Sequence, residues 1–410
     1  MTGRPLHALL LPPAAQPASA GRLLDALAAA LDGSGPAILP LDPRLPRAQT
    51  GALLEACAPT AVETPAGTRR WRPAGAAGPG AGGVPPEVAV VIATSGSTGE
   101  PKGVQLAGAA LLHSARASLD RIGARAGDRW LCPLPTSHVA GLGILVRSLV
   151  SGTTPVVVQR LGDRLGAAAA RCAHVSLVPT QLRRLLAAGA DLARFSTILL
   201  GGAAAPAGLL AAARAAGARV VTTYGMTETC GGCVYDGVPL AGVSVRTGTG
   251  GRIEVTGPVL FSGYRLRPDL TGQAMADGWL VTSDIGAVES GRVSVHGRAD
   301  EMINTGGEKV APGEVAAALE LCPGVREAVV IGQPDPEWGE RVTAVVVPDD
   351  PAQPPALPVL RAAVVERLPP YAAPRALVLV AEVPLLPSGK PDLAALRGLS
   401  RDDDGPGSPL

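Results

Sequence analysis

The first 297 residues alternate short β-branched runs with alanine-rich stretches. We interpret the runs as strands and the alanine-rich segments as helices, a pattern that predicts layered α/β structure. The runs are VAVVIA, TPVVVQ, HVSLVP, STILL and RVVTTY, which begin at residues 88, 154, 174, 196 and 219.

The pattern changes after residue 298. Pro312 is predicted to be the first residue of a helix, with Glu314 in its first turn and Pro323-Gly324 beyond its end. The elements that follow predict a compact α+β unit of about a hundred residues that is able to fold on its own. They are a strand at 325–331, a strand at 341–347, a helix at 358–368 and a strand at 375–380.

Length and charge narrow the class of protein. A chain of 410 residues predicts two or three domains. The balance of 36 basic and 35 acidic residues gives no reason to expect nucleic acid or an anionic membrane as a partner. The longest charge-free run, 195–213, contains Gly201-Gly202 and Pro206, so we interpret it as a strand, a turn and a helix rather than a membrane span.

The six cysteines are scattered, which argues against a disulfide framework and for a reducing, cytoplasmic location. Cys230 and Cys233 form a CxxC pair, but no second pair and no histidine lies within 35 residues, as a zinc site would require. A redox role would need a thioredoxin-like context that the sequence lacks. We interpret the pair as small residues in a glycine-rich turn.

The stretch IATSGSTGEPKGVQL, residues 92–106, combines glycines, hydroxyl residues and one lysine directly after an apolar run. Free N–H groups, hydroxyls and the Lys102 cation suit a polyphosphate. The order differs from a P-loop, because Gly-Lys-Ser/Thr does not follow Gly96 at the required spacing. A flexible Gly/Ser linker is the alternative interpretation.

Five further stretches complete a pattern. They are GGAAAP at 201–206, TTYGMTET at 222–229, GWLVTSDIG at 278–286, GRADEMINTGGEKVAPGEV at 297–315 and PLLPSGKPD at 384–392. With the glycine loop, and in this order, they resemble the acyl-adenylate-forming superfamily of acyl-CoA ligases, adenylation domains and luciferases. The resemblance covers residues 36–397.

The resemblance implies an α/β fold with a large N-terminal domain of layered subdomains and a small, mobile C-terminal α+β domain. In this chain the large domain is expected at 1–297, a hinge at 298–300 with Asp300 at its centre, and the small domain at 301–400. Residues 401–410 are rich in Asp, Pro and Gly and are expected to be a disordered tail.

The resemblance also implies roles in binding ATP and Mg²⁺. The family's phosphate loop matches Thr94, Ser95, Gly96, Ser97, Thr98, Gly99 and Lys102. Thr227 would supply a hydroxyl to phosphate and Glu228 a carboxylate to the metal. Tyr224-Gly225 and Gly201-Gly202 would line the adenine site, Asp284 would accept the ribose hydroxyls, and Arg298 would add a cation. Ser283 departs from the glycine usual in the family.

Lys390 matches the family's catalytic lysine, which bridges the carboxylate of the acid and the α-phosphate. Because it belongs to the small domain, the site would be assembled by domain closure. Gly306-Gly307 match the loop that leaves room for the pantetheine arm of CoA. Without the other motifs, Lys390 in a Pro-Ser-Gly loop would be interpreted as a solvated turn lysine.

The segment 132–150 contains no acidic residue, which disfavours an amino acid substrate. His138 and Gly141 match the His-x-x-Gly of acyl-CoA ligases. The short chain and its pocket motifs most resemble the o-succinylbenzoate-CoA ligases of menaquinone synthesis. Their substrate has a second carboxylate, for which Arg147, or else Arg183, is a candidate.

Three functions remain open at this point. They are an o-succinylbenzoate-CoA ligase, another aryl- or acyl-CoA ligase or carrier-loading enzyme, and a non-catalytic adenylate-binding relative. The last would be expected to lack Lys390 or Glu228, and both are present. The expected partners are a small carboxylic acid, ATP and CoA, with no stable membrane insertion and a possible homodimer.

Overall fold

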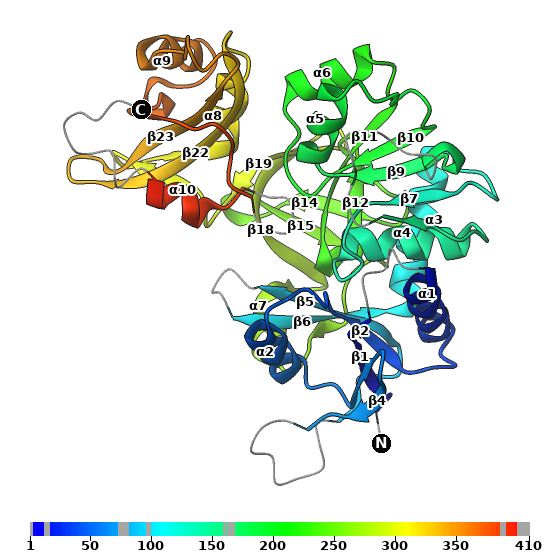
Figure 1. Cartoon of the computed structure of the whole chain (residues 1–410). Helices are drawn as coiled ribbons and strands as arrows, with labels where there is room; N and C mark the ends of the chain where they lie inside the picture. Colours follow the sequence, from blue (N-terminus) through cyan, green and yellow to red (C-terminus); the bar gives the residue numbers. More distant parts are fainter. Residues whose placement is uncertain are drawn as a thin grey trace.

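The computed structural model describes residues 3–11, 17–72, 82–95, 100–158, 161, 169–385 and 391–399. Its elements form four sheets, three of them made by the first 298 residues and one by the residues after them. Figure 1 shows the last sheet at one end of the molecule and the N-terminal sheet at the other. The predicted domain limits at 297 and 301 stay predictions.

The N-terminal sheet has the order β16-β6-β5-β2-β1-β3-β4. Alternate strand residues point to opposite faces, so Ile38 packs toward α1 while Leu39 packs toward α2. The predicted strand at 88–93 is β5, which continues to Ser95. The elements are β1 (Leu6–Leu9), α1 (Pro17–Asp32), β2 (Ala37–Pro40), α2 (Arg47–Cys57), β3 (Ala61–Thr64), β4 (Gly67–Arg70), β5 (Val88–Ser95), β6 (Pro101–Ala107) and β16 (Gly263–Tyr264).

The second sheet contains the other four predicted runs, in the order β13-β12-β11-β10-β9-β7-β8. Leu199 packs into the core below α3 and α4, whereas Ile198 and Leu200 pack beneath α5 and α6. The strand predicted at 154–159 is only Val156–Val157 in the described residues. The strands are β7 (Trp130–Cys132), β8 (Val156–Val157), β9 (His174–Leu177), β10 (Thr197–Leu200), β11 (Val220–Met226), β12 (Gly231–Tyr235) and β13 (Val238–Pro239).

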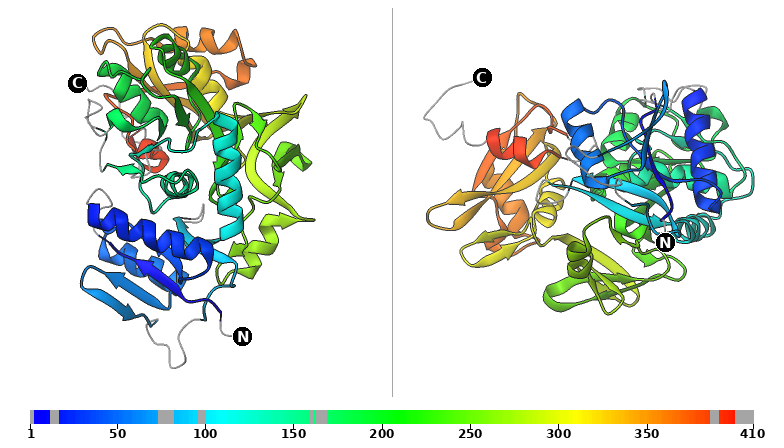
Figure 2. Two further views of the ribbon diagram at one scale, coloured as in Figure 1. Left: turned by 90° about the vertical axis from the view of Figure 1, so that its right-hand side faces the viewer. Right: turned by 90° about the horizontal axis from the view of Figure 1, so that it is seen from below.

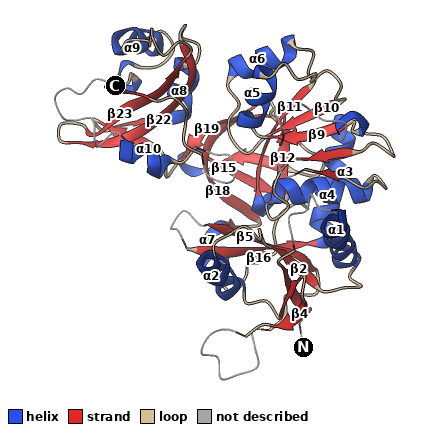
Figure 3. Cartoon of the chain, in the orientation of Figure 1, coloured by secondary structure: helices blue, strands red, loops and turns tan. Residues whose placement is uncertain are grey.

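Four helices cover this second sheet, two on each face, as Figures 1 and 3 show. α3 (Gly108–Ile122) and α4 (Val139–Val150) also pack against the N-terminal sheet, so they join the two layers into one core. α5 (Pro179–Ala187) and α6 (Ala207–Ala215) cover the opposite face. No helix in the described part of the chain is long and apolar enough to cross a bilayer.

The third sheet pairs its described strands antiparallel throughout and lies beside the first two (Figure 2). Ile253 and Val255 from its middle strand complete the core under α3. Its elements are β14 (Ser244–Thr247), β15 (Arg252–Thr256), α7 (Pro268–Ala274), β17 (Met275–Ala276), β18 (Trp279–Glu289) and β19 (Arg292–Arg298).

The fourth sheet confirms the α+β unit expected after residue 298. On β23, Val346 packs against α8 and α9, while Val345 and Val347 pack on the α10 side. The hairpin of β20 and β21 and the helix α10 were not predicted, and α9 ends three residues before the predicted limit. The elements are β20 (Ile303–Thr305), β21 (Glu308–Val310), α8 (Pro312–Leu319), β22 (Val325–Asp335), β23 (Gly339–Pro348), α9 (Leu357–Val365), β24 (Ala376–Leu379) and α10 (Leu393–Leu399).

Candidate active site

The glycine loop joins two antiparallel strands of the N-terminal sheet, β5 and β6. Thr94 is paired with Lys102 across the hairpin, and Ser95 with Pro101. Gly96, Ser97, Thr98 and Gly99 lie outside the described residues. The ends of the loop are therefore fixed by strand pairing, and Lys102 is presented from the start of β6.

Glu228 meets Lys102 and a tyrosine that the sequence did not predict. The Tyr264 hydroxyl donates a hydrogen bond of 2.7 Å to Oε1 of Glu228, and Nζ of Lys102 lies 3.5 Å from the same oxygen. The Lys102 ammonium also lies 4.1 Å from the centroid of the Tyr264 ring. We call these three residues the Glu228 cluster. It brings together the glycine hairpin, the end of β11 and the short strand β16.

A tight turn after β11 positions Glu228. The 3₁₀ helix η2 (Thr227–Thr229) begins where β11 ends, and Thr229 Oγ1 accepts from the Met226 N–H and donates to the Gly231 carbonyl. The Phe261 N–H donates to the Glu228 carbonyl at 2.9 Å. These bonds fix the backbone on both sides of Glu228, whose side chain is 12% exposed.

Asp284 is the carboxylate of a second, similar group. The Tyr224 hydroxyl donates to Oδ2 of Asp284 at 2.7 Å, and Nη1 of Arg298 lies 3.9 Å from Oδ1. Asp284 and Arg298 are directly paired on the neighbouring strands β18 and β19. We call Tyr224, Asp284 and Arg298 the Asp284 cluster. Arg298 is also bound bidentately by Asp300, with distances of 2.9 and 2.8 Å.

Both tyrosines remain hydrogen-bond donors at neutral pH. Burial raises the pKa of Tyr224, and the Asp284 carboxylate raises it further. Burial and the Glu228 carboxylate act in the same way on the pKa of Tyr264. Each phenol therefore stays protonated and orients the carboxylate that it faces.

Two of the predicted glycines lie where neighbouring atoms leave no room for a side chain. A Cβ on Gly201 would lie 2.2 Å from Oγ1 of Thr223, and one on Gly225 would lie 2.0 Å from the Gly231 carbonyl oxygen. Gly202 follows with a φ of +84°. Thr223 and Gly225 flank Tyr224 on β11, so the close packing fixes Tyr224 between the end of β10 and the start of β12.

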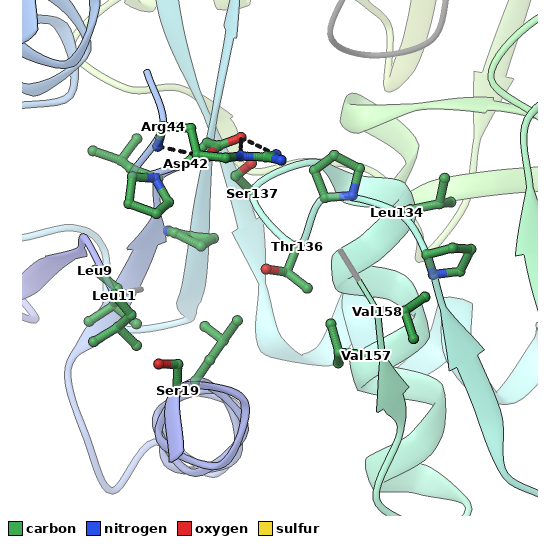
Figure 4. Close-up of a pocket in the computed structure, with 16 residues that line it drawn as sticks. Leu9, Leu11, Ser19, Asp42, Arg44, Leu134, Thr136, Ser137, Val157 and Val158 are labelled. Carbon is green, nitrogen blue, oxygen red and sulfur yellow. Dashed lines mark hydrogen bonds and ion pairs between the residues drawn. The ribbon is translucent and has the colours of Figure 1, made fainter. Parts of the chain in front are cut away.

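His138 is the residue that precedes helix α4, and its carbonyl accepts from the Leu142 N–H at 2.9 Å. Gly141, one turn along, packs on the Pro135 carbonyl, where a Cβ would lie 2.2 Å from the oxygen. The turn at 133–137 borders a pocket of about 90 Å³ between the N-terminal and second sheets, shown in Figure 4. The pocket walls are residues of β1, α1, β8 and the segments 40–44 and 133–137.

Asp42 and Arg44 form an ion pair in this pocket wall, with hydrogen bonds of 2.7 to 3.2 Å (Figure 4). The Arg44 hydrogen bonds hold the pKa of Asp42 below its usual range, and His138 adds a smaller effect in the same direction. The pocket is therefore lined by leucine, valine and proline side chains and by the hydroxyl residues Ser19, Thr136 and Ser137, with one charged pair near the predicted site residue His138.

The two arginines proposed for an acyl pocket lie in different places. Arg147, on α4, stacks its guanidinium 4.5 Å from the Trp130 ring centroid and donates to Ser176 Oγ at 3.2 Å. Its Nε is buried without a hydrogen-bond partner among the described residues, and burial lowers its pKa. Arg183, on α5, instead pairs with Glu327 at 2.5 Å and Glu320 at 3.9 Å, both beyond residue 298.

The remaining site predictions concern residues beyond the hinge. Gly306 and Gly307 form the turn between β20 and β21, and the Gly306 N–H donates to the Trp338 carbonyl at 2.9 Å. Lys390 lies outside the described residues. The residues that flank its segment, Leu385 and Pro391, pair in an antiparallel bridge.

Tyr264 and Arg265 are the positions in this region that sequence reasoning missed. The chain has only four tyrosines, and Tyr264 follows the apolar stretch PVLF directly after a small Ser-Gly step. A tyrosine so placed in a tyrosine-poor chain was the available signal. Its partners were not visible, because β16 pairs with β6 across more than 150 residues, as Gly263 with Gln105 and Tyr264 with Val104.

Two protein families match separate parts of the chain. The family described as AMP-binding enzyme matches residues 81–265, and the AMP-binding enzyme C-terminal domain matches residues 314–390.

Two curated relatives from different organisms each match more than half of the chain. The chain is 46% identical over 326 residues to a probable 2-succinylbenzoate–CoA ligase of Mycobacterium tuberculosis, covering 76% of this chain and 84% of the relative. It is 36% identical over 295 residues to a feruloyl-CoA synthase of Streptomyces, covering 64% of this chain and 60% of the relative.

A solved structure gives the same arrangement of domains. The o-succinylbenzoate CoA synthetase of Bacillus subtilis, in complex with the acyl-adenylate intermediate, superposes with a TM-score of 0.79 at 26% identity. The match covers 100% of this chain and 90% of that one. The predicted fold class, a large N-terminal α/β domain followed by a smaller C-terminal domain, is confirmed.

Proposed function

Because the chain belongs to the AMP-binding enzyme family, we propose that it joins o-succinylbenzoate to CoA through an acyl-adenylate, as an AMP-forming acid-thiol ligase of menaquinone biosynthesis. A carboxylate oxygen attacks the α-phosphorus of ATP and pyrophosphate leaves. The sulfur of CoA then attacks the acyl carbon, and AMP leaves. The observation that carries the proposal is the similarity to a 2-succinylbenzoate–CoA ligase along most of both chains.

The Asp284 cluster is proposed to hold the nucleoside. Its carboxylate is oriented by Tyr224 and backed by the Arg298 cation, which leaves oxygen lone pairs to accept the ribose hydroxyls. Gly201-Gly202 and Tyr224 would form the walls of the adenine site. Since AMP keeps the whole nucleoside, this cluster is expected to serve both steps.

The Glu228 cluster is proposed to hold the phosphates. Lys102 and the hydroxyls of Thr94 and Thr227 would face the phosphate oxygens, with the glycine loop as further donor. The donor set fits Mg²⁺ that arrives with ATP, because one carboxylate suffices when water and phosphate supply the other ligands. No group of three or more His, Cys, Asp or Glu that could hold a metal occurs among the described residues. Bound there, Mg²⁺ would neutralise phosphate charge.

Lys390 is proposed to bring its charge between the carboxylate and the α-phosphate, which lowers their repulsion in the transition state. Replacing it with alanine should therefore abolish adenylate formation and largely spare the reaction of a preformed adenylate with CoA. The two half-reactions, measured separately, serve as each other's control. An equal loss of rate in both half-reactions would contradict the proposed role of Lys390 in adenylate formation.

Arg147 is proposed to receive the second carboxylate of o-succinylbenzoate. It is a buried cation that makes no ion pair within the described part of the chain. A carboxylate beside its unpartnered Nε would complete its hydrogen bonds. Arg183, whose charge is met by Glu327, is the matched comparison. Arg147→Leu should raise KM for o-succinylbenzoate about tenfold or more with little change for ATP. If Arg183→Leu raised this KM and Arg147→Leu did not, the second carboxylate would instead be assigned to Arg183.

Another aryl-CoA ligase is the second candidate, favoured by the similarity to a feruloyl-CoA synthase. His138, Gly141 and the pocket of Figure 4 would then accept a different ring with the same mechanism. A cytoplasmic location and a homodimer stay predictions from the sequence.

The deciding experiment measures pyrophosphate release from ATP and Mg²⁺ with o-succinylbenzoate, ferulate, benzoate, a medium-chain fatty acid or no acid, each with and without CoA. Selective turnover of o-succinylbenzoate to a CoA thioester is the expected result. Selective turnover of ferulate or another acid would keep the mechanism and replace the substrate.

A further inference from the structure

Tyr264 contacts both charged members of the Glu228 cluster, and it does so with two different parts of its side chain. Its hydroxyl donates to Oε1 of Glu228, while its ring face lies under the ammonium of Lys102. A hydroxyl bonded to a carboxylate and a ring facing a cation are both favourable contacts. One buried tyrosine thus contacts an anion and a cation that also contact each other.

The contact between Lys102 and Glu228 has to open when ATP binds, if the proposed function holds. Nζ of Lys102 lies 3.5 Å from Oε1 of Glu228. In the proposed function Lys102 binds the phosphates and Glu228 binds the metal. The contact between the two side chains is therefore replaced by one contact to each of these ligands. A closer ion pair between the Glu228 carboxylate and Lys102 would oppose this exchange of ligands.

The scaffold holds Tyr264 in a fixed place while its partners exchange ligands. Its N–H donates to Thr271 Oγ1 at 2.8 Å, and its ring packs edge-on against Phe261 with centroids 4.9 Å apart. The next residue, Arg265, is almost completely buried and donates to the carbonyls of Cys57 and Ala58 at the end of α2. These contacts tie the tyrosine backbone to two layers of the large domain.

We propose that Tyr264 is a positioning residue. Its hydroxyl orients Glu228 toward the metal that accompanies ATP, and its ring holds the Lys102 ammonium beside Glu228. This proposal rests on the proposed function and adds a residue to it. The hydroxyl acts on Glu228 and therefore on the metal, whereas the ring acts on Lys102 and therefore on the phosphates. The two actions are separable, because Tyr264→Phe removes the first alone and Tyr264→Leu removes both.

The test measures binding by calorimetry, with no acid present. The probe is α,β-methylene-ATP, which cannot be cleaved at the reacting bond, titrated at a series of Mg²⁺ concentrations and without Mg²⁺, and AMP is titrated in parallel. Tyr235→Phe is the matched control, because Tyr235 is buried and its hydroxyl forms a hydrogen bond of 2.7 Å with the Ser118 hydroxyl rather than with the Glu228 cluster. Circular dichroism and thermal melting establish that each variant is folded.

We expect Tyr264→Phe to raise the Mg²⁺ concentration for half-maximal nucleotide binding about tenfold, with AMP affinity within twofold of the unchanged chain. Tyr264→Leu should in addition weaken metal-free binding of the analogue several-fold. In a Glu228→Gln background the effect of Tyr264→Phe on the Mg²⁺ requirement should disappear, which separates action through Glu228 from a general loss of packing.

An unchanged or lower Mg²⁺ requirement in Tyr264→Phe would overturn the inference, as would an equal loss of AMP binding. Absence of nucleotide binding by the unchanged chain would overturn the proposed function together with it. If Tyr264→Phe does not fold, Thr271→Val is the substitute, because it removes the hydroxyl that accepts from the Tyr264 N–H and donates to the Arg267 carbonyl. It is expected to change the Mg²⁺ requirement in the same direction by a smaller factor. No change in that variant would then overturn the inference.

Discussion

The Asp284 and Glu228 clusters have the same three parts and differ in what else holds the cation. In each, a tyrosine hydroxyl donates at 2.7 Å to a carboxylate, and a cation lies 3.9 or 3.5 Å from that carboxylate. In the Asp284 cluster the cation is Arg298, which Asp300 binds bidentately at the predicted hinge. In the Glu228 cluster the cation is Lys102, which rests on an aromatic ring.

This difference assigns the clusters to different events. Arg298 has a rigid planar head that three carboxylates contact, those of Asp284, Asp300 and Glu301, so it suits a part of the ligand that stays in place. Lys102 has a flexible stem and one neutral contact, so it can leave Glu228 for a phosphate. We therefore expect one cluster to hold the nucleoside throughout and the other to change partners during the reaction.

The largest expected effect comes from neutralising each carboxylate in turn. Glu228→Gln and Asp284→Asn should each lower the rate of adenylate formation about 100-fold or more, because charge-assisted contacts to the reacting nucleotide are lost. AMP affinity should separate them, falling in Asp284→Asn and staying close to the unchanged value in Glu228→Gln. Calorimetric titration with AMP checks this prediction. Equal AMP affinity in the two variants would contradict the assignment of the nucleoside to the Asp284 cluster alone.

A smaller effect is expected from the tyrosine of the Asp284 cluster. Tyr224→Phe removes one hydrogen bond to a carboxylate, which is worth roughly 1.5 to 3 kcal/mol, so nucleotide affinity should fall about tenfold or somewhat more. The loss should be the same for AMP and for ATP with Mg²⁺, and the Mg²⁺ requirement should not change. Tyr371→Phe, at an exposed position of the 3₁₀ helix η4 (Pro370–Ala372), is the control. A shift in Mg²⁺ requirement would mean that the clusters are not independent.

The smallest effect is expected where neither cluster is touched. Arg183→Met breaks the ion pairs with Glu327 and Glu320, which join the large domain to the part of the chain after the hinge. Partly exposed pairs contribute little, about 1 kcal/mol or less. Affinities for AMP and for ATP with Mg²⁺ should stay within twofold, while the ratio of the two half-reaction rates shifts a few-fold.

The charge-exchanged variant Arg183→Glu with Glu327→Arg is the control for that prediction and should restore the ratio. An unchanged ratio in Arg183→Met would show that the contact does not influence the domain arrangement. A changed AMP affinity would show instead that α5 reaches the Asp284 cluster.

Local pattern predicted the parts of the fold that form from neighbouring residues. The β-branched runs at Val88 and Val220 became β5 and β11, and Pro312 begins α8. The two-residue strand β16 has no local pattern, since it exists only because β6 offers an unpaired edge. Motif order indicated Glu228, Lys102 and Asp284, whereas Tyr264 and the partners of Arg183 depend on how distant segments pack, which no window of sequence contains.

The pairing of β16 with β6 also sets an order for biosynthesis. The strands β1 to β6 leave the ribosome first, but the edge of β6 stays unpaired until residues 263 and 264 follow, and the carbonyls at the end of α2 wait equally long for Arg265. An exposed edge is a site for wrong pairing between chains. All strands of the second sheet are therefore synthesised before the first sheet can be closed. We expect truncation before residue 263 to leave an aggregation-prone fragment rather than a smaller domain.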